Sequence, residues 1–142
     1  MNIKVVYQTK TGNTKKVAEA IADELGVKAQ SIDSFEDFSA DPVDLLFLGS
    51  GLYFENISKE VKAFIDMLDP KQINAAAVFS TSGSANSFGI INMTKRLEKR
   101  GIAVSDRSFK CHGAAFGTMF PTHPDEEDLN AARQFAQDVA DK

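Results

Sequence analysis

Cysteine and long apolar runs are scarce in this sequence, and each absence excludes a class of protein. Cys111 is the single cysteine among 142 residues, so no internal disulfide or multi-cysteine metal site can form. No apolar run approaches the roughly 20 residues of a membrane-spanning helix, and the N-terminus has no basic segment followed by a long apolar stretch. We therefore expect a cytoplasmic protein of a reducing compartment that does not associate with membranes.

The net charge of the chain is also small. Sixteen lysines and arginines face twenty aspartates and glutamates, which gives a formal net charge of −4 at pH 7 and a pI near 5.1. This balance argues against a nucleic-acid partner and is compatible with a protein partner that has a basic surface. With 43% hydrophobic residues the composition is that of a folded globular protein, and we expect a single domain spanning residues 1–142.

Apolar runs alternate with helical patterns along the chain. The predicted strands cover residues 3–7, 27–32, 43–49, 75–79 and 102–111, the last with a weak point at 105–107. The predicted helices cover residues 15–25, 58–68 and 88–100, with a fourth that starts at Pro124 and a doubtful short one within 34–42. This alternation predicts an α/β fold, a three-layer sandwich in which helices cover both faces of a parallel sheet.

A strand-to-helix turn at residues 9–14 carries the clearest binding motif. Its six residues are Thr9, Lys10, Thr11, Gly12, Asn13 and Thr14. The first N–H groups of a helix have no partners inside the helix and carry partial positive charge, so this position suits a phosphate group. The hydroxyls of the turn can donate to such a phosphate. An ordinary helix cap is the alternative interpretation, because threonine and asparagine are common capping residues.

Two other loops are predicted to reach the same edge of the sheet. Residues 50–57 follow the third strand and include Tyr53 and Phe54, whereas residues 80–87 follow the fourth strand and are small and polar. Ligands of open α/β sheets bind beyond the carboxyl ends of the strands. A ligand with a phosphate at one end and a flat ring at the other would contact all three segments.

Other nucleotide-binding and phosphate-binding folds lack their motifs here. The chain has neither Gly-x-x-x-x-Gly-Lys-[Ser/Thr] nor a Gly-x-Gly-x-x-Gly after the first strand. A receiver domain needs an aspartate at the end of the third strand, where this chain has Leu48, Gly49 and Ser50. These absences exclude a P-loop NTPase, a dinucleotide-binding domain and a receiver domain.

Together these features resemble a short-chain flavodoxin, over the whole length of the chain. Residues 9–14 match the family pattern [ST]-x-T-G-x-T directly after the first strand. The resemblance implies a flavodoxin-like sheet of five strands in the order 2-1-3-4-5. It also implies bound FMN, with the isoalloxazine ring between the second and third loops and Tyr53 stacked on it. The expected FMN contacts are Thr9, Lys10, Thr11, Gly12, Asn13, Thr14, Leu52, Tyr53, Phe54, Thr81, Ser82 and Gly83.

Two positions depart from the family pattern. Many flavodoxins have a glycine after the stacking aromatic residue, and the peptide there turns over when the flavin is reduced, whereas this chain has Phe54. Positive φ costs a non-glycine residue roughly a kcal/mol or more, so we expect the one-electron-reduced flavin to be short-lived. Asn86 and Phe88 replace the acidic and tyrosine residues of electron carriers, so one face of the ring is expected to be open.

Three functions are compatible with this resemblance. The first is an FMN-binding electron carrier that shuttles electrons between a reductase and an acceptor, as a monomer or weak dimer. The second is a small FMN-dependent NAD(P)H or quinone reductase, and the third is a flavin-free binding module. A chain of 142 residues offers few residues for a lid over a substrate, which favours the carrier. In a carrier the cofactor does the redox chemistry, so no catalytic side chain is assigned.

Two pairs of residues near the C-terminus have simpler interpretations than catalysis. Cys111 and His112 are adjacent on a predicted strand, so their side chains point to opposite faces and cannot easily pair as nucleophile and base. We therefore interpret Cys111 as a buried structural thiol. His123 and Pro124 precede the last helix, where capping explains them better than metal binding does.

Overall fold

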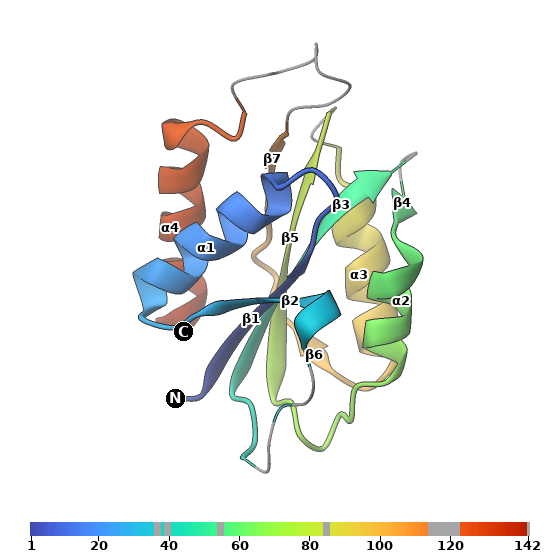
Figure 1. The fold of residues 1–142 in the computed structure, drawn as a ribbon. Coiled ribbons are helices and arrows are strands. Elements are labelled where there is room, and N and C mark those ends of the chain that lie inside the picture. Colours follow the sequence, from blue (N-terminus) through green and yellow to red (C-terminus); the bar gives the residue numbers. More distant parts are fainter. Residues whose placement is uncertain (36–37, 39–40, 54–55, 84–85, 114–122, 142) are drawn as a thin grey trace.

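The computed structural model describes residues 1–35, 38, 41–53, 56–83, 86–113 and 123–141, with the backbone but not the side chain of Tyr53. Two helices cover each face of a central sheet (Figure 1). Helices α1 (Asn13–Leu25) and α4 (Glu126–Ala140) lie side by side on one face, and α2 (Lys59–Asp66) and α3 (Phe88–Lys99) on the other. The predicted three-layer α/β sandwich is confirmed.

The sheet has the predicted topology with two additions. Its strands are β1 (Ile3–Gln8), β2 (Ala29–Ser31), β3 (Leu45–Tyr53), β4 (Asn56–Ile57), β5 (Ala75–Ser82), β6 (Ala103–Val104) and β7 (Phe109–His112). The order β2-β1-β3-β5-β6 is the predicted 2-1-3-4-5 order, and these pairings are parallel. The fifth predicted strand is broken at its weak point into β6 and β7, which both pair with β5, and β4 adds a short antiparallel pairing to β3.

Strands β3 and β5 are longer than the sequence predicted. The prediction ended them at Gly49 and Phe79, where large apolar side chains stop, and interpreted the next residues as loops. In the structure the pairing continues through Ser50 with Ser80 and Gly51 with Thr81. These four small residues are buried, and the strands continue through them because of backbone hydrogen bonding rather than apolar side chains. The first residues of both predicted loops are therefore fixed in the sheet.

Several helix boundaries also differ from the prediction, by one or two residues in α2 (Lys59–Asp66) and α3 (Phe88–Lys99). Helix α1 begins at Asn13 rather than residue 15, because Gly12 adopts a left-handed conformation with φ of 93° and serves as the N-cap. Helix α4 begins at Glu126 rather than Pro124, because the Asp125 side chain caps it. Of the doubtful helix within 34–42, residues 36–37 and 39–40 lie outside the described residues, and a short 3-10 turn covers Ile32–Ser34.

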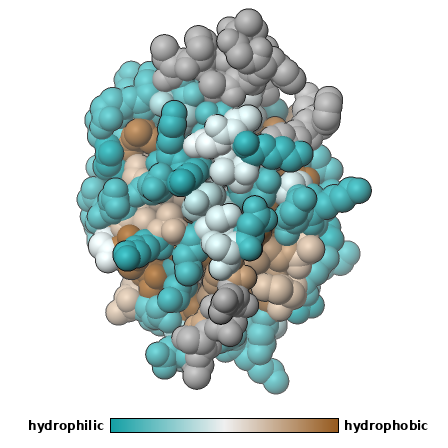
Figure 2. Space-filling model, in the orientation of Figure 1, coloured by the Kyte–Doolittle hydropathy of each residue, from teal (hydrophilic) through white to brown (hydrophobic). Residues whose placement is uncertain are grey.

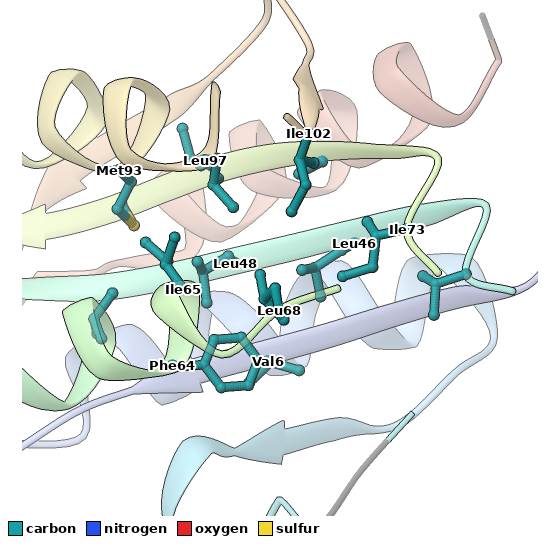
Figure 3. Packing of buried hydrophobic residues seen from close by; sticks show 14 of the residues in the cluster. Val6, Leu46, Leu48, Phe64, Ile65, Leu68, Ile73, Met93, Leu97 and Ile102 are labelled. Carbon is teal, nitrogen blue, oxygen red and sulfur yellow. The ribbon is translucent and has the colours of Figure 1, made fainter. Parts of the chain in front are cut away.

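A hydrophobic cluster fills each space between the sheet and its helices. Figure 3 shows the cluster under α2 and α3, in which Val6 and Leu48 of the sheet meet Ile65 and Leu97 of the helices. The second cluster lies under α1 and α4, where the Phe47 and Phe135 ring centroids are 5.7 Å apart. Both faces of β1, β3 and β5 are therefore buried, as a parallel sheet requires.

The outer surface is polar on the face that Figure 2 presents, where hydrophilic side chains predominate and apolar side chains form small patches. Among the described residues, none of the helices combines the length and apolarity that crossing a membrane would require.

Candidate functional site

The carboxyl ends of β1, β3 and β5 meet at one edge of the sheet, at the top of Figure 1. Gln8, Ser50 and Ser80 stand opposite one another in the register of these strands. The turn that follows β1 lies close to the end of β5. The most direct contact is a buried hydrogen bond of 2.9 Å between the hydroxyls of Thr14 and Thr81, which are 67 residues apart in the sequence. It joins the turn at residues 9–14 to the end of β5.

The turn at residues 9–14 is held by its own hydrogen bonds. The Gly12 N–H donates to the Thr9 hydroxyl at 2.9 Å, and the Asn13 amide donates to the Thr11 hydroxyl at 2.9 Å. Gly12 is the N-cap of α1 and has no side chain with which to cap it, and a Cβ added at Gly12 would meet no atom within 4 Å. Lys10 and Thr11 are exposed to solvent. The turn thus presents donors around an open glycine at a helix N-terminus.

The end of β3 places Leu52 under helix α3. A Cβ built on Gly89 would lie 2.7 Å from the Leu52 Cδ2 atom, so the first turn of α3 approaches this strand closely because residue 89 is glycine. Leu52 is half-buried and packs against the cluster under α2 and α3. The Tyr53 side chain and all of Phe54 lie outside the described residues, so stacking on a ring remains a prediction.

The end of β5 is tied to β7. The Gly113 N–H donates to the Ser82 carbonyl at 3.0 Å, and the His112 ring lies with its Nδ1 atom 3.0 Å from the Gly83 carbonyl oxygen. Thr81 is buried and bonds to Thr14, whereas Ser82 and Gly83 are half-buried. The Ser82 hydroxyl oxygen is itself buried and has no hydrogen-bond partner among the described residues.

Gly113 is a site residue that the sequence reasoning missed. A Cβ added to Gly113 would lie 2.7 Å from the Asn13 amide nitrogen and 3.0 Å from the Asn13 Cβ and Cγ atoms. The exit of β7 therefore touches the turn that follows β1. A glycine directly after the last strand is the signal in the sequence that could have indicated this contact.

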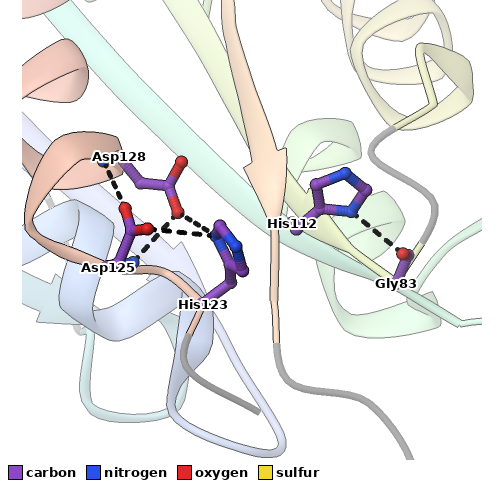
Figure 4. Close-up of polar contacts among 5 residues, drawn as sticks. All are labelled: Gly83, His112, His123, Asp125 and Asp128. Carbon is purple, nitrogen blue, oxygen red and sulfur yellow. Dashed lines mark hydrogen bonds and ion pairs between the residues drawn. The ribbon is translucent and has the colours of Figure 1, made fainter. Parts of the chain in front are cut away.

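The two histidines of the chain flank the exit of β7, where their ring centroids are 5.7 Å apart. Figure 4 shows His123 directed at the start of α4, where its Nδ1 atom is 2.6 Å from Asp128 and 3.8 Å from Asp125. Hydrogen bonding to Asp128 raises the pKa of His123. One ring nitrogen of His123 and one carboxylate oxygen each of Asp125 and Asp128 lie within 4.8 Å of one another, a spacing that also suits a metal ion. Each carboxylate is, however, engaged in the reciprocal capping box of α4, so capping accounts for the arrangement.

Cys111 lies on the opposite face of β7 from His112, within the cluster under α1 and α4. Its side chain is 6% exposed, and burial raises the pKa of the thiol to about 12. Because the thiolate is the reactive form, this cysteine is inert at neutral pH. The interpretation of Cys111 as a buried structural thiol agrees with this geometry.

Comparisons with known proteins agree with the fold. A family model described as a flavodoxin domain matches residues 4–115. An uncharacterized protein of Methanocaldococcus jannaschii is 31% identical over 136 residues, which cover 89% of each chain. A flavodoxin of Clostridium saccharobutylicum is 30% identical, over 100% of this chain and 97% of that relative. Among solved structures, a flavodoxin from the domain Archaea is similar with a TM-score of 0.81 at 20% identity, over 99% of this chain and 97% of that one.

Proposed function

This chain belongs to the flavodoxin family, and on that premise we propose that it binds FMN at the carboxyl edge of its sheet and carries electrons between redox protein partners. The observation that carries the proposal is the turn at residues 9–14, which presents hydroxyl and amide donors around an open glycine where α1 begins. Such a turn binds a phosphate through hydrogen bonds and the helix dipole, without a metal ion.

The phosphate end of FMN fits the chemistry of this turn. Thr9, Thr11, Asn13 and Thr14 supply neutral donors, and the exposed Lys10 adds positive charge nearby. Two of these side chains also hold the turn in place, since Thr9 accepts from the Gly12 N–H and Thr14 bonds Thr81. The turn is therefore preformed, which lowers the entropy cost of binding.

The ring end of FMN fits the neighbouring strand ends. Leu52 and Tyr53 end β3, and Thr81 and Ser82 end β5, directly before Gly83. A ring in this position would lie between the ends of these two strands. The Ser82 hydroxyl, buried and without a partner among the described residues, can donate to a polar atom of the ring. FMN, when bound, accepts and returns electrons, while these residues hold it and shape its surroundings.

Flavin titration of the purified protein tests this proposal. The protein should be yellow as isolated, or should take up FMN stoichiometrically and quench its fluorescence. A variant that combines Thr11→Ala with Asn13→Ala should bind FMN much more weakly, while its affinity for riboflavin, which lacks the phosphate, changes little. Protein that neither carries nor binds FMN would refute the proposal, and equal losses for both flavins would show that the turn does not hold phosphate.

Mixing with NAD(P)H in a stopped-flow instrument tests the carrier role. A carrier receives electrons from a protein partner, so the flavin should stay oxidised in NAD(P)H alone and should be reduced only after a flavodoxin reductase is added. Rapid direct bleaching by NAD(P)H would contradict the carrier role and support a reductase.

A further inference from the structure

Three buried side-chain oxygens lack a hydrogen-bond partner among the residues that the structure describes: Gln8 Oε1, Ser80 Oγ and Ser82 Oγ. Gln8 is 6% exposed and Ser80 is 1% exposed, so water outside the molecule does not reach them. A buried polar atom that gives up its hydration without a new partner destabilises the folded state. Three such atoms in one region therefore indicate that something else satisfies them.

The three oxygens share one face of the sheet. Gln8, Ser50 and Ser80 stand in register across β1, β3 and β5, and Ser82 lies two residues beyond Ser80. Because side chains alternate along a strand, all four point toward the layer that contains α2 and α3. The strand residues two positions before this row belong to the apolar cluster of that layer. Toward the carboxyl ends, the same face changes from apolar to polar.

Helix α3 covers the Ser80 end of this polar row. A Cβ built on Gly89 would lie 3.3 Å from the Ser80 Cβ, so the first turn of the helix passes directly over the serine. The Ser50 hydroxyl already donates to the Gly51 carbonyl at 2.7 Å. It therefore does not supply a proton to either neighbour in the row.

The row reaches solvent at its other end. Lys110 of β7 pairs with Ser80 in the sheet, and its exposed ammonium group donates to the Ser87 hydroxyl at 2.6 Å, just before α3 begins. Polar side chains thus extend from the buried Gln8 to the surface.

We propose that Gln8, Ser80 and Ser82 bind ordered water between the sheet and the first turn of α3. Gln8 Oε1 needs a donor, whereas a serine hydroxyl can donate and accept, and water supplies both functions in the smallest volume. Buried waters typically make about three hydrogen bonds to groups of this kind. The proposal concerns the flavin-free protein, so it stands or falls separately from FMN binding. Ser82 would belong both to this water site and to the proposed flavin site.

The stability of variants tests the proposal by its sign. Ser80→Ala and Gln8→Met each remove one of the oxygens at similar side-chain volume. If water bridges the oxygens, each change leaves a water or a partner oxygen unsatisfied, and the melting midpoint should fall by about 3 °C or more. If the oxygens are truly unpaired, removing one should raise the midpoint. Ser50→Ala is the matched control, because the Ser50 hydroxyl has a protein acceptor. The change in melting midpoint that it causes should be the same whether residue 8 is Gln or Met.

A crystal structure at about 1.5 Å resolution gives the second readout. The expected result is at least one water within hydrogen-bonding distance of both Gln8 and Ser80 in the wild-type protein, displaced or lost in Ser80→Ala. Density without such a water, or direct pairing of these side chains with protein groups, would overturn the proposal. A raised melting midpoint in either variant would overturn it as well.

Discussion

Gly113→Ala is the substitution that tests the assembly of the proposed flavin site most sharply. Gly113 does not have positive φ, so its backbone accepts alanine, but the new Cβ would lie 2.7 Å from the Asn13 amide nitrogen. Real Cβ atoms do not approach other atoms so closely, so the Asn13 side chain must move away. The substitution should therefore disturb the turn at residues 9–14 from a position 100 residues further along the chain, with little effect on the core.

The expected magnitude follows from the hydrogen bond that Asn13 would donate to the phosphate. A hydrogen bond to a charged group contributes about 1.5–3 kcal/mol. Since 1.4 kcal/mol corresponds to a factor of ten, we expect the dissociation constant of FMN to rise about 10- to 100-fold. The dissociation constant of riboflavin should change by less than about threefold, because riboflavin makes no phosphate contact. Fluorescence quenching during titration of each flavin measures both values.

A double-mutant cycle identifies the cause. If the alanine acts by displacing Asn13, then Gly113→Ala should add almost nothing once Asn13 is itself alanine. The melting midpoint of each variant shows whether the fold is intact. The reasoning is refuted if Gly113→Ala leaves FMN affinity unchanged, or if its effect adds fully to that of Asn13→Ala.

Three other perturbations give measurable outcomes. Thr14→Val should lower the free energy of unfolding by about 1–2 kcal/mol in a denaturant titration, because it leaves the buried Thr81 hydroxyl without its partner, and an unchanged midpoint would contradict this. The hydrogen bond to Asp128 raises the pKa of His123, so protonated His123 stabilises the fold. This stabilisation is complete below pH 6.5, the ordinary pKa of histidine, and is lost as the pH rises through the raised pKa. The melting midpoint should thus decline above pH 6.5 in the wild-type protein but not in His123→Gln, and parallel profiles would refute the assignment. Cys111 should react with a thiol reagent only on unfolding, and rapid labelling of the native protein at pH 7 would disprove its burial.

The architecture was predictable from the sequence because the pattern of each element lies within a short segment. The apolar runs of β1, β3 and β5 and the break at residues 105–107 are features of short segments, and the turn at residues 9–14 is a contiguous motif. The errors were at the ends of strands and helices. Ser50 and Ser80 belong to strands although they are polar, because a neighbouring backbone, which the local pattern does not reveal, pairs with each of them.

The less predictable part of the site consists of contacts between segments that are distant in the sequence. Neither Gly113 beside Asn13 nor Thr14 bonded to Thr81 follows from the spacing of residues, since both depend on the register of several strands. The polar row that begins at Gln8 cannot be predicted from the sequence for the same reason. Its members are separated by apolar residues in the sequence and become neighbours only across the sheet.

The bond between the Thr14 and Thr81 hydroxyls and the contact of Gly113 with Asn13 have a consequence for biosynthesis. The turn at residues 9–14 leaves the ribosome before two of the groups that complete it, which lie 67 and 100 residues further along the chain. A nascent chain that ends before β7 can form the turn and its helix without enclosing a cofactor. Capture of the proposed FMN should therefore be a late event, limited by the arrival of β7.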